Sequence, residues 1–225
     1  MKIVAINGSP KGKASNTSVM VGAFLKGARE VGAETVNIFL AEKEIEHCRG
    51  CHVCWERGPG QCIINDDMPG VLSQMAGANV IVFATPVYFE NISGMLKVFM
   101  DRMTMIGGPQ TQVAAKQNNQ NMEHVETHIP RLMLISNCGH ADREEFQVIS
   151  HWIKRVSLKM HMPLAGEIYM PQGKLLTADR EDLKPAISGY LKLLEDAGKE
   201  IASNLKLSET TEKLLEQSRI GSGIQ

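Results

Sequence analysis

The sequence predicts an α/β fold in which helices cover both faces of a five-stranded parallel sheet. Short apolar runs of strand length alternate with longer stretches of helical spacing along most of the chain. The run at 79–85 is continuously apolar, as in a central parallel strand that is buried on both faces. Three of the expected strands end in distinctive loops rich in Gly, Ser, Pro or Asn.

The individual elements follow from periodicity and from the residues that interrupt it. The strands are short runs rich in Ile, Val, Leu and Met, expected at 2–6, 34–40, 79–85, 131–137 and 163–170. The helices carry apolar residues at helical spacing, and they are expected from about 16 to 31, 68 to 76, 93 to 103, 142 to 158 and 179 to 204. Ser93 and Asp67 are suitable N-caps for two of these helices.

Two stretches do not fit this pattern. Residues 43–67 form a cysteine-rich insert after the second strand. Residues 107–130 are rich in Gln and Asn and long for an internal loop, so they could be a lid, a subunit contact or disordered. We expect one domain over 1–205, followed by a C-terminal tail at 206–225 with a short helix and a frayed end.

Right-handed crossovers leave few topologies for such a chain. We expect the flavodoxin-like strand order 2-1-3-4-5, in which the loops after strands 1, 3 and 4 lie together at the carboxyl edge, where ligands bind. These loops are residues 8–17, 86–91 and 137–140.

The first loop has the chemistry of a phosphate site. Free N–H groups and the helix dipole favour an anion at the start of the helix near Asn16. Ser9, Ser15 and Thr17 add hydroxyl groups, and Lys11 adds positive charge. Neither a P-loop nor a Gly-x-Gly-x-x-Gly motif is present, and the hydroxyls suit a terminal phosphomonoester. An ordinary capped helix after a strand is the alternative.

Composition limits the function classes. The net charge is −1 and no basic stripe is visible, which argues against nucleic acid as a partner. No apolar run suits a membrane span, and the early polar Asn7 argues against a secretory signal, so we expect a cytoplasmic protein. The four cysteines between 48 and 62 then indicate metal or redox chemistry.

The motifs together resemble a known family. Gly8-Ser9-Pro10 with Ser15-Asn16-Thr17, then Thr85-Pro86-Val87-Tyr88, then Leu96-Lys97 with Asp101-Arg102, look like the NADPH-dependent FMN reductase group of flavodoxin-like proteins. The resemblance covers about residues 1–205. With the cysteines added, the chain is most similar to the iron-sulfur flavoproteins.

The resemblance implies an FMN site built from the three loops. The first loop would bind the phosphate, the second would line the isoalloxazine ring, and the third would approach the pyrimidine end. The implied residues are Ser9, Lys11, Ser15, Asn16, Thr17, Pro86, Val87, Tyr88, Phe89, Asn91, Asn137, Cys138, Gly139 and His140. No catalytic side chain is required, because the flavin carries the chemistry, although His140 could also touch flavin or substrate. Lys97 and Asp101, four residues apart, are expected to pair on a helix surface.

The cysteines have the spacing Cys48-x2-Cys51-x2-Cys54-x7-Cys62. Bacterial ferredoxins begin their cluster motif with the same Cys-x2-Cys-x2-Cys. In iron-sulfur flavoproteins a compact group of this kind holds a [4Fe-4S] centre. Free or disulfide-forming thiols remain an alternative, and so does zinc, which more often uses two separated Cys-x2-Cys pairs.

Three functions are therefore open. The first is an iron-sulfur flavoprotein that passes electrons between a [4Fe-4S] cluster and FMN, with a ferredoxin-like donor and a small redox acceptor. The second is a cluster-free FMN or quinone reductase that uses NAD(P)H. The third is a non-enzymatic module that carries zinc or thiols. The resemblance also implies a homodimer or homotetramer.

Overall fold

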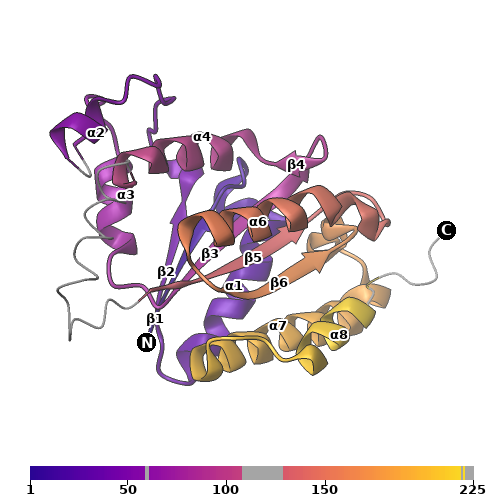
Figure 1. Ribbon diagram of the computed structural model, residues 1–225. Coiled ribbons are helices and arrows are strands. Elements are labelled where there is room, and N and C mark those ends of the chain that lie inside the picture. The colour runs from indigo at the N-terminus through magenta and orange to yellow at the C-terminus, as the bar shows by residue number, and fades with distance from the viewer. Residues whose placement is uncertain (59–60, 108–128, 219, 221–225) are drawn as a thin grey trace.

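A five-stranded parallel sheet forms the centre of the molecule (Figure 1). The computed structural model describes residues 1–58, 61–107, 129–218 and 220. The sheet order is β2-β1-β3-β5-β6, formed by β1 (Lys2–Asn7), β2 (Glu34–Phe39), β3 (Val80–Tyr88), β5 (Arg131–Asn137) and β6 (Leu164–Met170). This confirms the predicted order of the long strands. The two-residue β4 (Asn91–Ile92), which the sequence did not reveal, pairs antiparallel with the end of β3.

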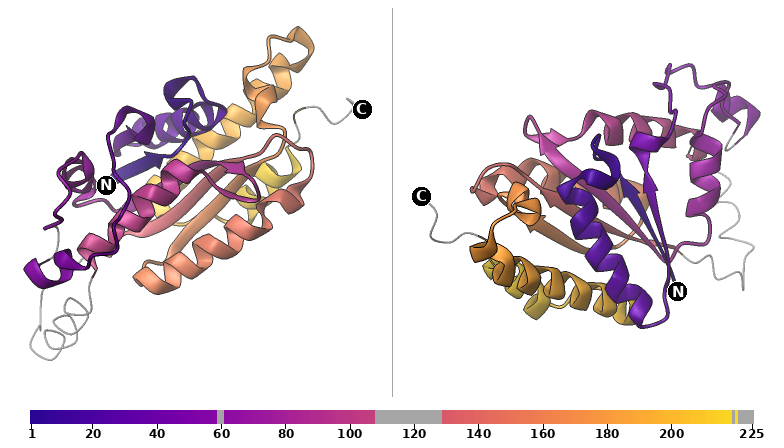
Figure 2. Two further views of the ribbon diagram at one scale, coloured as in Figure 1. Left: turned by 90° about the horizontal axis from the view of Figure 1, so that it is seen from above. Right: turned by 180° about the vertical axis from the view of Figure 1, so that it is seen from behind.

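Helices cover both faces of the sheet (Figure 2). One face packs against α1 (Asn16–Glu30), α7 (Lys184–Asn204) and α8 (Glu209–Gln217). The other packs against α3 (Met68–Met75), α4 (Gly94–Arg102) and α6 (Gln147–Met160). The short α2 (Val53–Arg57) lies in the cysteine-rich insert. Short 3-10 turns are η1 (Gly12–Ala14), η2 (Leu40–Glu42), η3 (Met103–Ile106), η4 (Arg143–Phe146), η5 (Gly173–Thr177) and η6 (Glu181–Leu183).

The alternation of side chains in β1 explains its continuous apolar run. Ile3 and Ala5 are buried in the core beneath α1 and α7, whereas Val4 and Ile6 are buried in the core beneath α3 and α4. Because both faces are covered, every position of the strand favours an apolar residue.

Two glycines let α1 and α7 touch through their backbones. A Cβ atom on Gly27 would lie 1.8 Å from the carbonyl oxygen of Glu195, and one on Gly198 would lie 1.9 Å from that of Phe24. Any larger residue would force the two helices apart. This close packing fixes the position of α1, whose first turn borders the loop after β1.

Some boundaries differ from the sequence-based prediction. The helix expected from 142 begins as the 3-10 turn η4, because the Asp142 side chain accepts a hydrogen bond from the N–H of Glu144. The helix expected from 179 begins at Lys184, with Pro185 in its first turn, where a missing N–H costs nothing.

The C-terminal region contains α8 as its short helix. Leu207, Leu215 and Ile220 are buried in the same core as α7, and the N–H of Leu207 donates to the carbonyl of Ala165. The Gln/Asn-rich segment 107–130 lies largely outside the described residues, so its predicted role stays a prediction. Among the described helices, none combines the length and apolar character needed to cross a membrane.

Candidate functional site

A cavity of about 190 Å³ lies at the carboxyl edge of the sheet. It brings together the three loops predicted from the sequence and a fourth loop, after β6. The lining residues are Ser9, Lys11, Ser15, Asn16, Thr17, Pro86, Val87, Tyr88, Asn137, Cys138, Gly139 and Lys174. All but three of the residues predicted to bind FMN line this one cavity.

The first turn of α1 supplies the anion-binding part. Ser15 is the N-cap, and its Oγ accepts a hydrogen bond from the N–H of Ser18 at 3.0 Å and donates to the carbonyl of Gly12 at 2.7 Å. The hydroxyl of Ser15 therefore shapes the turn. The next N–H groups, of Asn16 and Thr17, have no acceptor within the helix and are available to an anion.

Hydrogen bonds hold this turn and the loop before it to the neighbouring loops. The amide of Asn137, at the end of β5, donates to the hydroxyl of Thr17 at 2.7 Å. The hydroxyl of Thr177 donates to the Asn16 side chain at 2.9 Å. The N–H of Gly8 donates to the carbonyl of Ala84 at 2.7 Å, which ties the β1 loop to β3.

The donors fit a phosphate group. The lining combines hydroxyls and the N–H groups at the start of α1 with Lys11 and Lys174, and none of its described residues carries a carboxylate. Such a set stabilises a dianion and would repel a cation. Val87 and Tyr88 add apolar surface to the same lining, as the flat ring of a flavin requires.

Three of the predicted residues do not line the cavity. Phe89 is fully exposed at the tip of the β3–β4 turn, with φ of 48°. The Asn91 side chain accepts a hydrogen bond from the N–H of Ile92. The His140 side chain is exposed, while its carbonyl accepts hydrogen bonds from Gln172 and Cys138. The binding of flavin by these three residues stays a prediction.

The Cys138 thiol lies buried at the cavity and donates to the carbonyl of His140 at 3.3 Å. Burial raises the pKa of this thiol, so it is held protonated. The neighbouring Gly173 has no room for a side chain, because a Cβ atom there would lie 2.8 Å from the Asn137 side chain.

Lys174, the next residue after Gly173, lines the cavity. The sequence analysis did not identify this residue. Its only signal in the sequence was that the fifth strand also ends at this edge of the sheet.

A second cavity, of about 130 Å³, contains all four cysteines of the insert. Cys48 and Cys51 are exposed, Cys54 and Cys62 are half-buried, and all four are free thiols. Burial raises the pKa of the Cys54 thiol, and the nearby Cys62 raises it further. Within the described ranges no three His, Cys, Asp or Glu side chains stand in a ready-made metal geometry. The four cysteine sulfur atoms of this lining are a donor set of the kind that suits a metal centre.

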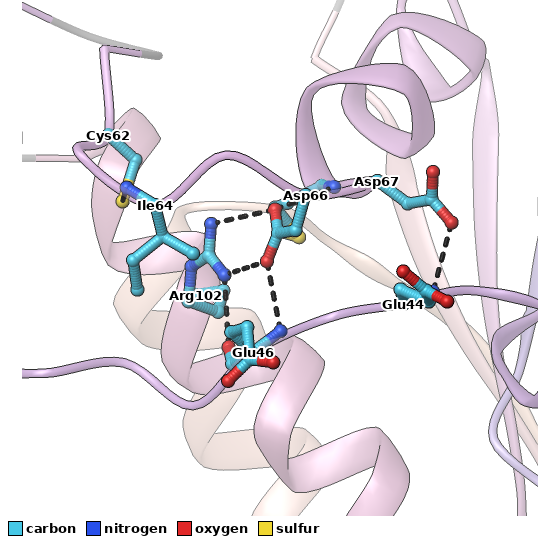
Figure 3. Close-up of polar contacts among 8 residues, drawn as sticks. Glu44, Glu46, Cys62, Ile64, Asp66, Asp67 and Arg102 are labelled. Carbon is cyan, nitrogen blue, oxygen red and sulfur yellow. Dashed lines mark hydrogen bonds and ion pairs between the residues drawn. The ribbon is translucent and has the colours of Figure 1, made fainter.

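A buried ion pair lies beside this cavity (Figure 3). Both terminal nitrogens of Arg102 donate to the carboxylate of Asp66, and Nη1 also donates to the carbonyl of Glu46 at 2.9 Å. Burial by itself would raise the pKa of Asp66, but the hydrogen bonds from Arg102 and from the N–H groups of Glu46 and Met68 hold it below its ordinary value.

The structure corrects one predicted helix cap. Asp67 occupies the N-cap position of α3, but its carboxylate accepts from the N–H of Glu44 instead. The carboxylate of Asp66, one residue earlier, accepts from the N–H of Met68 at 3.1 Å. The predicted surface pair of Lys97 and Asp101 is confirmed, at 2.5 Å between partly exposed side chains.

The comparisons with known proteins identify the family. The family model described as NADPH-dependent FMN reductase matches residues 1–171. An iron-sulfur flavoprotein of Methanocaldococcus jannaschii is 42% identical over 102 residues, which are 45% of this chain and 51% of the relative. One of Methanosarcina thermophila is 38% identical over 106 residues, 47% of this chain and 54% of the relative. The chain thus spans about half the length of the curated relatives it matches.

The similarity to solved structures extends over most of the chain. An FMN-dependent NADH-azoreductase from Bacillus anthracis, solved in complex with FMN, aligns with a TM-score of 0.60 at 19% identity. The alignment covers 89% of this chain and 99% of that one. At this level of identity the likeness shows the fold.

Proposed function

The chain belongs to the NADPH-dependent FMN reductase family, and we propose that it is an FMN-binding oxidoreductase of the iron-sulfur flavoprotein type. It would pass electrons between a [4Fe-4S] centre and FMN. The observation that carries this proposal is the convergence of four loops on one cavity, whose lining includes both phosphate donors and the side chains of Val87 and Tyr88.

Different residues of the cavity would bind different parts of FMN. The N–H groups of Asn16 and Thr17, with the charges of Lys11 and Lys174, would hold the phosphate. Tyr88 would cover the ring, and the backbone around Gly139 would lie near its pyrimidine end. When bound, FMN supplies the electron-transfer chemistry itself. The protein orients the group and shields it from water, and we assign no acid or base among the side chains.

The four cysteines of the insert are the proposed ligands of the cluster. Their shared cavity and their Cys-x2-Cys-x2-Cys-x7-Cys spacing support this assignment, and so do the names of the relatives. Unpaired thiols in this number suit a reducing cytoplasm. A ferredoxin-like donor, a small redox acceptor and a homodimer or homotetramer complete the proposal.

A cluster-free reductase that takes electrons from NAD(P)H is the second candidate. The observation that favours it is the exposure of Cys48 and Cys51, whose sulfur atoms are not gathered in a metal geometry. The fold is shared with an FMN-dependent NADH-azoreductase, whose name mentions FMN and NADH and no cluster.

The test is a visible absorption spectrum of protein purified without oxygen, with iron and acid-labile sulfide assayed on the same sample. We expect flavin bands over a broad shoulder, with about four iron and four sulfide per chain. Flavin bands without iron, even after reconstitution with iron and sulfide, would contradict the iron-sulfur flavoprotein and support the cluster-free reductase. Failure to bind added FMN would reject both.

A further inference from the structure

We propose that Arg102 is a positioning residue for the centre held by the four cysteines. Its Nε–H group donates a hydrogen bond to a sulfur atom of that centre, and its charge offsets the negative charge there. This inference rests on the proposed function, because it requires a metal–sulfur centre in the cysteine cavity.

The first support is an unused donor on a buried cation. The Arg102 side chain is 1% exposed, and its partner Asp66 is 3% exposed. Nη1 and Nη2 are occupied by Asp66 and by the carbonyl of Glu46. The Nε atom is buried, and no hydrogen bond from it to a described residue meets the usual geometry, although the Cys62 side chain is near enough to interact with the guanidinium group. Buried donors are nearly always hydrogen-bonded, so Nε is expected to gain a well-aligned acceptor when a bound centre gathers the sulfur atoms of the cavity.

The second support is the place where the arginine lies. Arg102 lines the cysteine cavity together with Cys48, Cys51, Cys54 and Cys62. Figure 3 shows its guanidinium group between Cys62 on one side and Asp66 on the other, and Arg102 and Cys62 are within interaction range. The acceptor that Nε lacks is therefore expected among the sulfur atoms of this cavity.

The third support is charge. Four thiolates outweigh the positive charge of an iron-sulfur core, so the assembled centre is an anion. Arg102 is the positive end of its ion pair with Asp66, and Figure 3 shows the guanidinium group on the side of the pair toward Cys62. A guanidinium group at the wall then offsets part of the added negative charge when the centre assembles. Hydrogen bonds to sulfur and nearby charge are known controls of reduction potential and metal affinity.

The flavin site should not respond to changes at Arg102. The N-terminal end of α4 is anchored separately, because the Ser93 hydroxyl donates to the carbonyl of Gly8 at 2.6 Å and the Ser93 N–H donates to Thr85. Arg102 occupies the opposite end of the helix. A change there should alter the cysteine cavity and leave the phosphate loop in place.

Two variants of the full chain test the proposal after anaerobic reconstitution with iron and sulfide. Arg102→Lys keeps the charge but removes Nε–H and the two-point contact with Asp66. Arg102→Met combined with Asp66→Asn removes both charges together, which avoids an uncompensated buried carboxylate. Lys97→Met is the matched control, because it removes a charge from an exposed position of the same helix.

The measurements are the midpoint potential of the cluster, the rate of iron release to a chelator, and the affinity for FMN. For both Arg102 variants we expect a more negative potential and iron release faster by about 10- to 100-fold. FMN affinity should stay within about twofold of the wild type, and Lys97→Met should match the wild type in all three measurements.

The outcomes separate this inference from the proposed function. A wild-type protein that binds FMN but takes up no iron would overturn both. If the wild type holds a cluster and both Arg102 variants keep its potential and iron retention, only the role of Arg102 is wrong. Loss of FMN from both variants would also overturn it, because Arg102 would then support the whole domain.

Discussion

The two candidate cofactor sites of this chain are built in different ways. The flavin cavity lies where parallel strands end, and buried hydrogen bonds such as the one between Asn137 and Thr17 hold its loops. The cysteine cavity lies on an irregular insert in which the described helix, α2, has five residues. The insert is tied to the domain by the Arg102–Asp66 pair and by a hydrogen bond from the Trp55 indole to the carbonyl of Thr104.

This difference indicates that the cysteine insert, more than the flavin loops, depends on a bound ligand for its ordered structure. The loops of the flavin cavity are held by hydrogen bonds between protein groups, from Asn137 to Thr17 and from Gly8 to Ala84. Two of the four cysteines are exposed, and a bound centre would draw them together. Metal binding would then contribute to the folding of the insert itself, as it does in small metal-dependent domains. The effects of substituting these cysteines should therefore be confined to the insert and should not reach the flavin cavity.

The largest expected effect comes from Cys51→Ser, which removes one of the four proposed ligands. We expect complete loss of the cluster, because a hydroxyl is a poor ligand for iron in such centres. FMN affinity should remain within about twofold of the wild type, since the flavin loops do not depend on the insert. Iron analysis and fluorescence titration with FMN measure the two effects, and loss of both cofactors would contradict the separation of the sites.

A smaller effect is expected from Ser15→Ala combined with Thr17→Ala. The Thr17 hydroxyl accepts from Asn137 and can still donate to the phosphate, whereas the Ser15 hydroxyl acts through the shape of the turn. One hydrogen bond to a charged group contributes about 1.5–3 kcal/mol, so FMN affinity should fall by about tenfold or more. Loss of the Ser15 cap should also cost about 1 kcal/mol of folding stability. The cluster should stay in place.

Ser208→Ala is the control for this double variant, because Ser208 caps α8 by the same type of bond to Thr211. It should lower the free energy of unfolding in urea by a similar amount without affecting FMN binding. An equal loss of FMN affinity in Ser208→Ala would mean that the effect of the Ser15→Ala and Thr17→Ala double variant reports stability alone.

The smallest effect is expected from Lys174→Met. This side chain is exposed, and exposed charges contribute about 0.2–1 kcal/mol, so FMN affinity should fall by roughly two- to fivefold. The difference should shrink as salt is added, since surface charges are screened. Lys192→Met on α7, outside the cavity, provides a charge-matched comparison. Equal affinity of Lys174→Met and the wild type at low salt would remove this lysine from the phosphate site.

Much of the fold followed from local pattern, because periodicity records which faces of an element are buried. The apolar run at 79–85 became β3 at the centre of the sheet, and Ser93 caps α4 as expected. The loops after strands 1, 3 and 4 meet because the carboxyl ends of parallel strands share one edge. Local residues and simple topology thus predicted most of the flavin cavity.

By itself, the sequence determined the strand order, the position of the phosphate loop and the grouping of the cysteines, since each depends on neighbouring residues or on strand topology. Only the tertiary structure decided which distant side chains meet. Arg102 pairs with Asp66 across 36 positions of the chain, Lys174 reaches the cavity from the last strand loop, and Phe89 lies in solvent. Such contacts depend on backbone turns and packing distances, which no local pattern encodes.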